Sequence, residues 1–389
     1  MTAVKCNPDP TVVRLLAALG LGFDCASQAE IELVLSLGIS PSRIIYANPC
    51  KAASFIRHAA ACDVRLMTFD NFDELNKVAR YHPRAQLVLR ILADDEGSLC
   101  RFGTKFGAAA EVVPGLLKRA KELKLDVVGV SFHVGSGCTN PLLYDKAIAQ
   151  AKWAFELAEE EGFKMNLLDI GGGFEGVTFQ EIAKVVRQSV DAYFPKESGV
   201  KVIAEPGRFF VSEAFELATN IIARRGLAEE EEAPAKEVAE GEDMPMVMCK
   251  LLILSESAFA HRPCVDYVND GVYGAFNCIL FDHQVVSPEV LTLGHSLSLT
   301  TYRNDTWESA SVWGPTCDSI DLVSKCSTLP TDQLQIGDWL RWPTMGAYTI
   351  CAASQFNGFR KSQVYYTIDA RGRDEIGTAV YDLLQLGVA

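Results

Sequence analysis

The chain has 389 residues, of which 49% are hydrophobic and 22% are charged, a composition typical of a soluble globular protein with two or three domains. Its 36 Lys and Arg residues against 50 Asp and Glu residues give a net charge of −14, which argues against nucleic-acid binding because phosphate backbones require clustered cations. The sequence has no uninterrupted apolar run of about eighteen residues, so we expect no membrane-spanning helix, and we expect no secretory signal at its start.

Short β-rich runs alternate with helical patterns over the first two hundred residues. Eight strand–helix units in succession predict a (β/α)₈ TIM barrel with a parallel sheet, and a doubly wound open sheet is the alternative. The predicted strands are Ala3–Cys6, Gly22–Cys25, Arg43–Ala47, Leu66–Phe69, Leu87–Ile91, Val127–His133, Asn166–Ile170 and Val202–Ala204.

Polar residues follow the predicted strands at their C-terminal ends. A barrel builds its active site at this edge, although strand ends also meet polar loops for purely structural reasons. These residues are Lys5, Asp24, Asn48, Asp70, Arg90, His133, Asp169 and Glu205.

After residue 208 the pattern changes to alternating segments typical of antiparallel β-structure. We therefore predict a barrel domain over residues 1–212 and a C-terminal, mostly antiparallel β-domain over residues 213–389. An acidic stretch followed by an apolar run predicts a disordered insertion at 226–264. The expected β-segments are Phe210–Ile222, Asp266–Val272, Asn277–Asp282, Ser311–Trp313, Gly337–Arg341, Ala347–Ala352 and Gln363–Thr367.

Two loops after the last two predicted barrel strands are candidates for binding a phosphate. The three glycines Gly171, Gly172 and Gly173 permit positive φ angles and a close backbone approach to an anion. The second loop is Glu205-Pro206-Gly207-Arg208. Phosphate sites in barrels often use these two loops, so together they indicate an anion site, although each alone is equally consistent with a tight turn.

A lysine at the end of the first predicted strand suggests the chemistry. If Lys5 faces the barrel mouth, desolvation would lower its pKa and make the amine a nucleophile; a solvent-directed lysine at a strand end is the alternative. A lysine, a phosphate site and an acid together predict a pyridoxal phosphate site, in which Glu205 keeps the ring nitrogen protonated. His133 has small neighbours that leave room for a flat ring, and Ser136 is close enough in sequence to donate to the phosphate.

The second half contributes a thiol and two acids. Cys317 and Asp318 lie in a turn-prone segment, and Asp282 ends another predicted strand. The two carboxylates are candidates for binding a distal ammonium group of a substrate, with ordinary surface charge as the alternative. The twelve cysteines show no CxxC pair, which predicts no metal site and no disulfide framework, but reduced thiols in a cytoplasmic enzyme.

Taken together, these motifs resemble the eukaryotic ornithine decarboxylases, those of fungi in particular, which are pyridoxal-phosphate enzymes with an alanine-racemase type of barrel. The resemblance covers nearly the whole chain apart from 226–264. Nine ordered blocks carry it: AVKCN (3–7), GFDCAS (22–27), IIYANPC (44–50), VVGVSFHVGSGC (127–138), LDIGGGF (168–174), AEPGR (204–208), YVNDGVYGAFNCILFDH (267–283), WGPTCD (313–318) and MGAY (345–348).

The resemblance implies a role for each matching residue. Lys5 carries the cofactor covalently, His133 stacks on its ring, and Cys317 is the proton donor. Glu205 pairs with the ring nitrogen. The phosphate positions are Ser136, Gly173, Gly207, Arg208 and Tyr348, with Gly171, Gly172 and Pro206 in the same loops; Asp24, Glu30 and Arg90 support the lysine and the cofactor, and Phe281, Asp282 and Asp318 contact the substrate.

The implied reaction converts L-ornithine to putrescine and CO₂, the first step of polyamine biosynthesis. The family forms head-to-tail homodimers with shared active sites, and some of its members bind antizyme. One alternative is a catalytically inactive antizyme-binding homologue, but such relatives tend to lose residues that this chain keeps, such as Lys5 and Cys317. The other alternative is decarboxylation of lysine, arginine or diaminopimelate; Asp318 favours a short diamine-type substrate over one with a distal carboxylate, but it separates ornithine from lysine only moderately.

Three features depart from the family pattern. Phe281 stands where tyrosine is common, and we expect this change to tune activity rather than abolish it. The family has several dozen residues before the AVKCN block, and it lacks the apolar segment 244–264. We therefore expect that leading residues are missing from this sequence and that it carries an extra segment.

Overall fold

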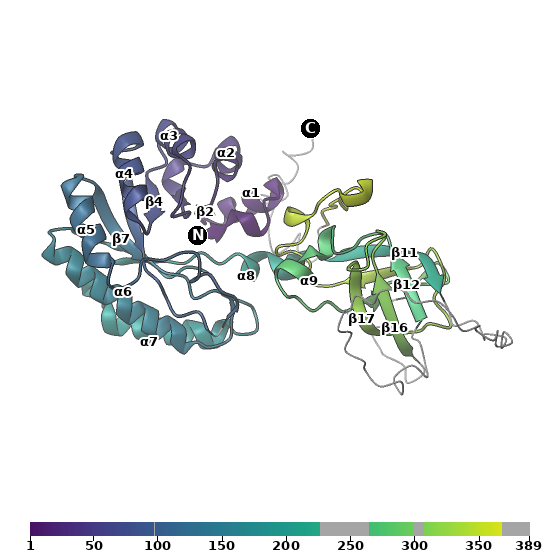
Figure 1. The fold of residues 1–389 in the computed structure, drawn as a ribbon. Helices are drawn as coiled ribbons and strands as arrows, with labels where there is room; N and C mark the ends of the chain where they lie inside the picture. Colours follow the sequence, from purple (N-terminus) through teal and green to yellow (C-terminus); the bar gives the residue numbers. More distant parts are fainter. Residues whose placement is uncertain (97, 226–263, 299–306, 368–389) are drawn as a thin grey trace, which may run out of the picture.

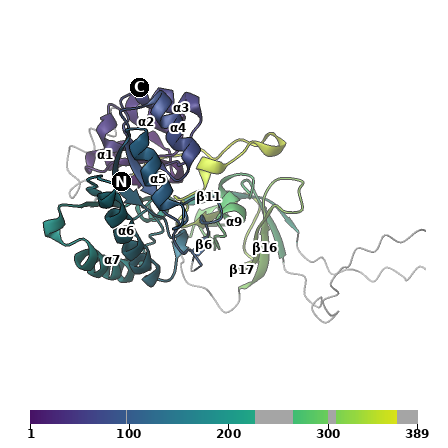
Figure 2. The ribbon, with the colours of Figure 1, turned by 60° about the vertical axis from the view of Figure 1, so that its left-hand side comes forward.

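A computed structural model describes residues 1–96, 98–225, 264–298 and 307–367 of the chain. Figures 1 and 2 show an α/β half beside a smaller β-rich half, and in Figure 1 the short helix α8 (Arg208–Val211) lies between them. The predicted acidic insertion lies outside the described residues, except that Cys264, assigned to it from the sequence, begins a strand. The domain boundary at residue 212 stays a prediction.

The first half is built on eight parallel strands, which confirms the predicted barrel class. The strands neighbour one another in chain order, whereas the strand order of a doubly wound sheet reverses at a switch point. The strands are β1 (Thr2–Ala3), β2 (Phe23–Cys25), β3 (Ile44–Tyr46), β4 (Leu66–Phe69), β5 (Gln86–Arg90), β7 (Asp126–Ser131), β9 (Leu167–Asp169) and β10 (Lys201–Ile203).

Helices alternate with these strands, and Figure 1 shows them around the outside of the sheet. Their apolar residues recur at helical spacing, as Leu75 and Val78 do in α4, and both are buried in the main core. In the described part of the chain, no helix is both long and apolar enough to cross a membrane. The helices are α1 (Pro10–Ala18), α2 (Gln28–Ser36), α3 (Ala53–Ala61), α4 (Phe72–Tyr81), α5 (Val113–Glu122), α6 (Leu142–Glu160) and α7 (Phe179–Tyr193).

The first strand is shorter than predicted. Pairing with β2 ends at Ala3, and Val4–Cys6 form a 3₁₀ turn that carries Lys5. The N–H of Ala3 donates to the carbonyl oxygen of Pro206 at 3.4 Å, which joins the first strand to the loop after the last. Lys5 therefore lies at the carboxyl edge of the sheet, as the sequence predicted, but on a turn.

The second half is a six-stranded sheet in the order β13-β18-β11-β12-β16-β17. All its pairings are antiparallel except that of β12 with β16, which confirms a mostly antiparallel domain. Two further antiparallel pairs, β14 with β15 and β6 with β8, lie outside the main sheets. The bounds are β11 (Leu217–Arg225), β12 (Cys264–Val268), β13 (Glu289–Val290), β14 (Thr292–Leu293), β15 (Ser296–Leu297), β16 (Glu308–Trp313), β17 (Leu322–Leu329), β18 (Trp339–Trp342), β6 (Ser98–Cys100) and β8 (Ser136–Cys138).

Some of the predicted β-segments are wrong. Asn277–Asp282 contains helix α9 (Cys278–Phe281), and Ala347–Ala352 ends in a 3₁₀ turn. Gln363–Thr367 has no strand, Phe210–Ile222 becomes a strand only at Leu217, and β17 was not predicted. A short apolar run fits a buried helix as well as a strand, so periodicity alone does not separate them.

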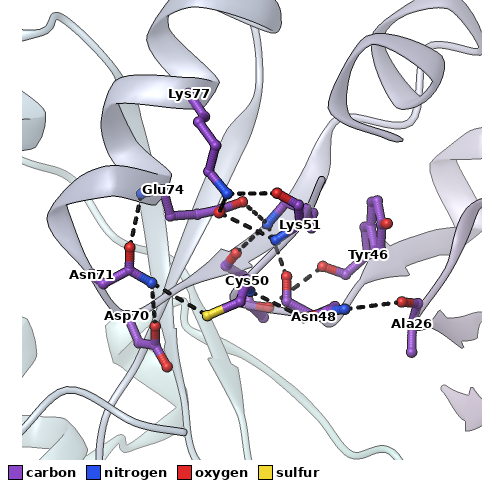
Figure 3. A network of polar contacts seen from close by, with 10 residues as sticks. Ala26, Tyr46, Asn48, Cys50, Lys51, Asp70, Asn71, Glu74 and Lys77 are labelled. Atoms are coloured by element: carbon purple, nitrogen blue, oxygen red, sulfur yellow. Dashed lines mark hydrogen bonds and ion pairs between the residues drawn. The ribbon is translucent and has the colours of Figure 1, made fainter. Parts of the chain in front are cut away.

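A buried ion-pair network joins the carboxyl ends of β3 and β4 (Figure 3). The fully buried Nζ of Lys51 lies 2.8 Å from Glu74 Oε1 and donates to the carbonyl oxygens of Asn48 at 2.9 Å and Thr68 at 2.6 Å. Lys77 Nζ lies 2.6 Å from the other oxygen of Glu74. The network fixes two loops at the edge where the predicted site residues lie.

Candidate active site

Lys5 and Asp24 form an ion pair at the carboxyl edge of the barrel. Lys5 Nζ lies 2.7 Å from Asp24 Oδ2, and the lysine side chain is 44% exposed whereas that of Asp24 is 1% exposed. Desolvation by the surrounding protein lowers the pKa of Lys5. The electrostatic effects of Asp24, Tyr348 and Glu205 are larger together and raise it above its ordinary value. The prediction of a lowered pKa for Lys5 is therefore wrong, because the neighbouring groups together outweigh the effect of desolvation.

His133 is held as a neutral ring just after β7. Its Nδ1 accepts the N–H of Gly135 at 3.0 Å, and Phe102 packs edge-on against it at 4.9 Å. Burial, with Arg90 and Lys5, lowers the pKa of His133 well below its usual range. These contacts fix the orientation of an uncharged imidazole, which suits a support for a flat ring. Arg90, at the end of β5, lies 5.0 Å from the ring centre of Phe106, and burial lowers its pKa.

The glycine loop brings His133 and Glu205 together. A Cβ on Gly172 would lie 2.9 Å from both the Glu205 carbonyl oxygen and His133 Nε2, so a side chain there would push the two apart. The N–H of Gly171 donates to Asp169 Oδ1 at 3.0 Å and is therefore not available to an anion. The N–H groups of Gly172 and Gly173 have no acceptor in the part of the chain that the structure describes.

Glu205 follows β10 and carries an orphaned oxygen. Its Oε1 is buried and has no hydrogen-bond partner among the described residues. Burial, with Asp169 and Asp24, raises the pKa of Glu205 well above its ordinary value. A buried acceptor without a donor costs free energy, so this atom marks a place where a ligand donor would be stabilised. A protonated ring nitrogen of pyridoxal phosphate is such a donor.

Arg208 and Asp282 lie against each other, which joins the predicted phosphate and substrate positions. Both side chains are 10% exposed, and their charged groups are in contact. Arg208 Nε also lies 3.2 Å from Glu175 Oε1, and its guanidinium lies 5.4 Å from the ring centre of Tyr348. The N–H of Tyr348 donates to the carbonyl oxygen of Cys6 at 3.0 Å, so the β-domain reaches the barrel edge at this point.

The other predicted cofactor residues line or brace the same edge. Glu30 Oε2 accepts the N–H of Ala26 at 2.7 Å, and burial raises the pKa of Glu30. Ser136 lies on β8, opposite Cys100 of β6. Pro206 accepts from the first strand, and a Cβ on Gly207 would lie 2.8 Å from the Cβ of Cys6.

Cys317 and Asp318 are not brought to this cluster within one chain. Cys317 is exposed, and its N–H donates to Asn357 Oδ1 at 3.4 Å. Asp318 accepts a hydrogen bond from the hydroxyl of Tyr273. Among the described residues, neither side chain contacts Asp282, whose partners are Arg208 and the Cys100 thiol. The expected binding of one ammonium group by both Asp282 and Asp318 is therefore not possible within a single chain.

Three polar residues at the site were given no role from the sequence. Asp169 was recognised only as a strand-end acid, and Glu175 and Cys100 were not recognised at all. Asp169 and Glu175 are each separated from the three glycines by one residue in the sequence. Two acids this close to a predicted phosphate loop could have indicated that they belong to the site. Nothing in the sequence linked Cys100 with Asp282, because their 3.6 Å contact spans 182 positions.

Comparisons with known proteins agree with this geometry. Family models for the pyridoxal-binding domain and the C-terminal sheet domain of pyridoxal-dependent decarboxylases match residues 1–212 and 142–346. Rattus norvegicus ornithine decarboxylase is 48% identical over 375 residues, covering 94% of this chain and 74% of the relative. Xenopus laevis antizyme inhibitor 2 is 48% identical over 371 residues, covering 94% and 75%. Paramecium bursaria Chlorella virus arginine decarboxylase, a solved structure, matches with a TM-score of 0.80 at 34% identity, over 94% of this chain and 88% of that one.

The family resemblance found in the sequence is thereby confirmed. The orphaned oxygen of Glu205 and the glycine loop that no side chain could occupy fit the cofactor of this family. The chain belongs to the pyridoxal-dependent amino-acid decarboxylases, and its cofactor is pyridoxal phosphate.

Proposed function

We propose that this protein decarboxylates L-ornithine to putrescine and CO₂, the first step of polyamine biosynthesis. The observation that carries the proposal is the buried carboxylate of Asp282, which lies against Arg208 at the mouth of the barrel. A carboxylate placed there binds the distal ammonium group of a diamine-type substrate by a charge-assisted hydrogen bond. The 48% identity to a mammalian ornithine decarboxylase supports the same substrate.

Each residue of the site has a distinct task in this proposal. Bound pyridoxal phosphate supplies an acceptor for the electron pair that the departing α-carboxylate leaves behind. Lys5 provides the amine that carries the cofactor, and Asp24 holds that amine in place. Glu205 holds a proton at the ring nitrogen, and Arg208 binds the phosphate together with the loop amides. Cys317 Sγ donates the proton that replaces the carboxylate at Cα.

A head-to-tail homodimer completes the site in this proposal. The Cys317–Asp318 loop of one subunit would reach the barrel mouth of the other, and its exposure in the single chain supports this arrangement. Exposed apolar residues gather in the same domain, including Phe281 at 70%, Ile320 at 50% and Phe359 at 43%.

Complementation between two inactive variants tests the shared site. Lys5→Ala and Cys317→Ala subunits are each expected to be inactive alone. Mixed in equal amounts, they should recover about a quarter of the wild-type activity, since half of the dimers are mixed and each has one intact site. No recovery after mixing, with dimers present on gel filtration, would show that each chain builds its own site.

A substrate panel tests the activity itself. With pyridoxal phosphate bound, we expect release of CO₂ from ornithine with a kcat/KM at least about tenfold above that for lysine, the scale of one methylene in a pocket. A preference for lysine or arginine would overturn the substrate. No CO₂ from any of the three would favour an antizyme-binding homologue without activity, the second candidate, which the similarity to antizyme inhibitor 2 supports.

Partners and location follow from the same proposal. Antizyme is a candidate regulator, supported by the antizyme inhibitor relative. The eleven cysteines that the structure describes are all free thiols, which supports a reducing compartment such as the cytoplasm.

A further inference from the structure

Two acids, each with a buried carboxyl oxygen, lie side by side next to the glycine loop. Asp169 ends β9 and is fully buried, and Glu205 follows β10, its neighbour in the sheet. The N–H of Glu205 donates to the carbonyl oxygen of Gly171 at 2.6 Å, and the N–H of Gly171 donates to Asp169 Oδ1. The backbone of the glycine loop therefore holds the two carboxyl groups in a fixed relation.

One oxygen of each acid remains without a donor. Asp169 Oδ2 and Glu205 Oε1 are both buried and unpartnered among the described residues, and the two side chains lie within hydrogen-bonding reach of each other. Two ionised carboxylates facing each other without water repel strongly. A single proton between them satisfies both atoms, because one acid donates and the other accepts.

None of the nearby cations donates a hydrogen bond to either orphaned oxygen in the part of the chain that the structure describes. Lys5 Nζ is engaged by Asp24 at 2.7 Å, and Asp24 adds a further negative charge near the pair. The guanidinium of Arg90 and the amino group of Met1 also attract both acids electrostatically. Burial raises the pKa of Asp169 to about 6 and that of Glu205 well above its ordinary value, as expected for a pair that keeps one proton near neutral pH.

We propose that Asp169 is a positioning residue that sets the basicity of Glu205. In the protein without cofactor, the two acids share one proton. When the ring nitrogen lies near Glu205, the O–H bond of the pair breaks and an N–H bond forms at the ring. The negative charge of Asp169 then stabilises the positive charge of the protonated ring and so opposes loss of that proton to solvent. The inference rests on the cofactor and is independent of which amino acid is the substrate.

Asp169→Asn separates this role from a merely structural one. The amide oxygen of asparagine still accepts the N–H of Gly171, so the loop geometry is kept. Its Nδ2 instead donates to Glu205 Oε1, which removes a charge and stabilises the carboxylate of Glu205. The variant should therefore bind the cofactor but hold the ring proton less tightly.

The test is ¹⁵N NMR of protein loaded with pyridoxal phosphate labelled at the ring nitrogen, titrated against pH. We expect Asp169→Asn to release the ring proton at a pH at least about one unit lower than the wild type, a tenfold change in affinity. Asp145→Asn is the matched control, because Asp145 also accepts a part-buried hydrogen bond, from Ser189, but lies on α6. A titration of Asp169→Asn identical to that of the wild type would overturn the proposal.

A second measurement tests the shared proton even if Asp169→Asn fails to bind the cofactor. Infrared spectra of the cofactor-free wild type at pH 7 should contain the carbonyl band of a protonated buried carboxyl group, and Glu205→Gln should remove it. Absence of that band in the wild type would overturn the shared proton. Neither outcome depends on the decarboxylation of any substrate.

Discussion

Lys5→Ala is expected to lower kcat/KM at least about 10³-fold, the scale of removing a residue that acts as a unit with other catalytic groups. The reason is the position of the amine at the barrel mouth, 2.7 Å from Asp24 and open to an incoming cofactor. Without it, the cofactor binds only by its phosphate and ring contacts. The measurements are CO₂ release and the visible absorbance of cofactor linked to the protein, and both should be lost.

Two further variants separate chemistry from charge. Lys5→Arg keeps a cation beside Asp24 but offers no amine, so we expect the same loss of activity with less change in stability. Lys118→Ala removes an exposed lysine on α5 and should leave activity unchanged. Lys5→Ala activity within tenfold of the wild type would contradict the assignment of Lys5.

Glu74→Gln is expected to lower the free energy of unfolding by about 3–5 kcal/mol, the usual cost of leaving one partner of a buried ion pair alone. Figure 3 shows why: Glu74 lies between Lys51 and Lys77, and the side chains of Lys51 and Glu74 have no exposed surface. Burial already lowers the pKa of Lys51. Urea unfolding followed by circular dichroism measures the change.

An exposed ion pair provides the control for that prediction. Glu122 pairs with Arg119 on the surface of α5 at 3.0 Å, and Glu122→Gln should cost less than about 1 kcal/mol. Replacing both fully buried partners, as Lys51→Met with Glu74→Leu, should recover much of the lost stability, because the one charge left unpaired is that of Lys77, whose side chain is 33% exposed. A Glu74→Gln protein as stable as the wild type would show that water or another group replaces the carboxylate.

Local patterns predicted most of the barrel but less of the β-domain. Each barrel strand is a short run of β-forming residues between helical segments. Because the strands pair in chain order, the local sequence pattern was enough to predict the topology. In the β-domain, Cys278–Phe281 was expected in a strand but is helical. There the Asn277 side chain donates to the carbonyl oxygens of Gly274 and Thr349, and the second of these contacts is invisible to a local pattern.

By itself, the amino-acid sequence determined the residue types of the site, the order of the barrel strands and the family. These depend on local propensity and on motifs that are contiguous in the chain. Only the tertiary structure decided which charges meet. It pairs Lys5 with Asp24 and so raises a pKa that desolvation alone would lower, and it places Asp282 on Arg208. Electrostatic free energy depends on distances and burial in space, which residues far apart in the chain acquire only on folding.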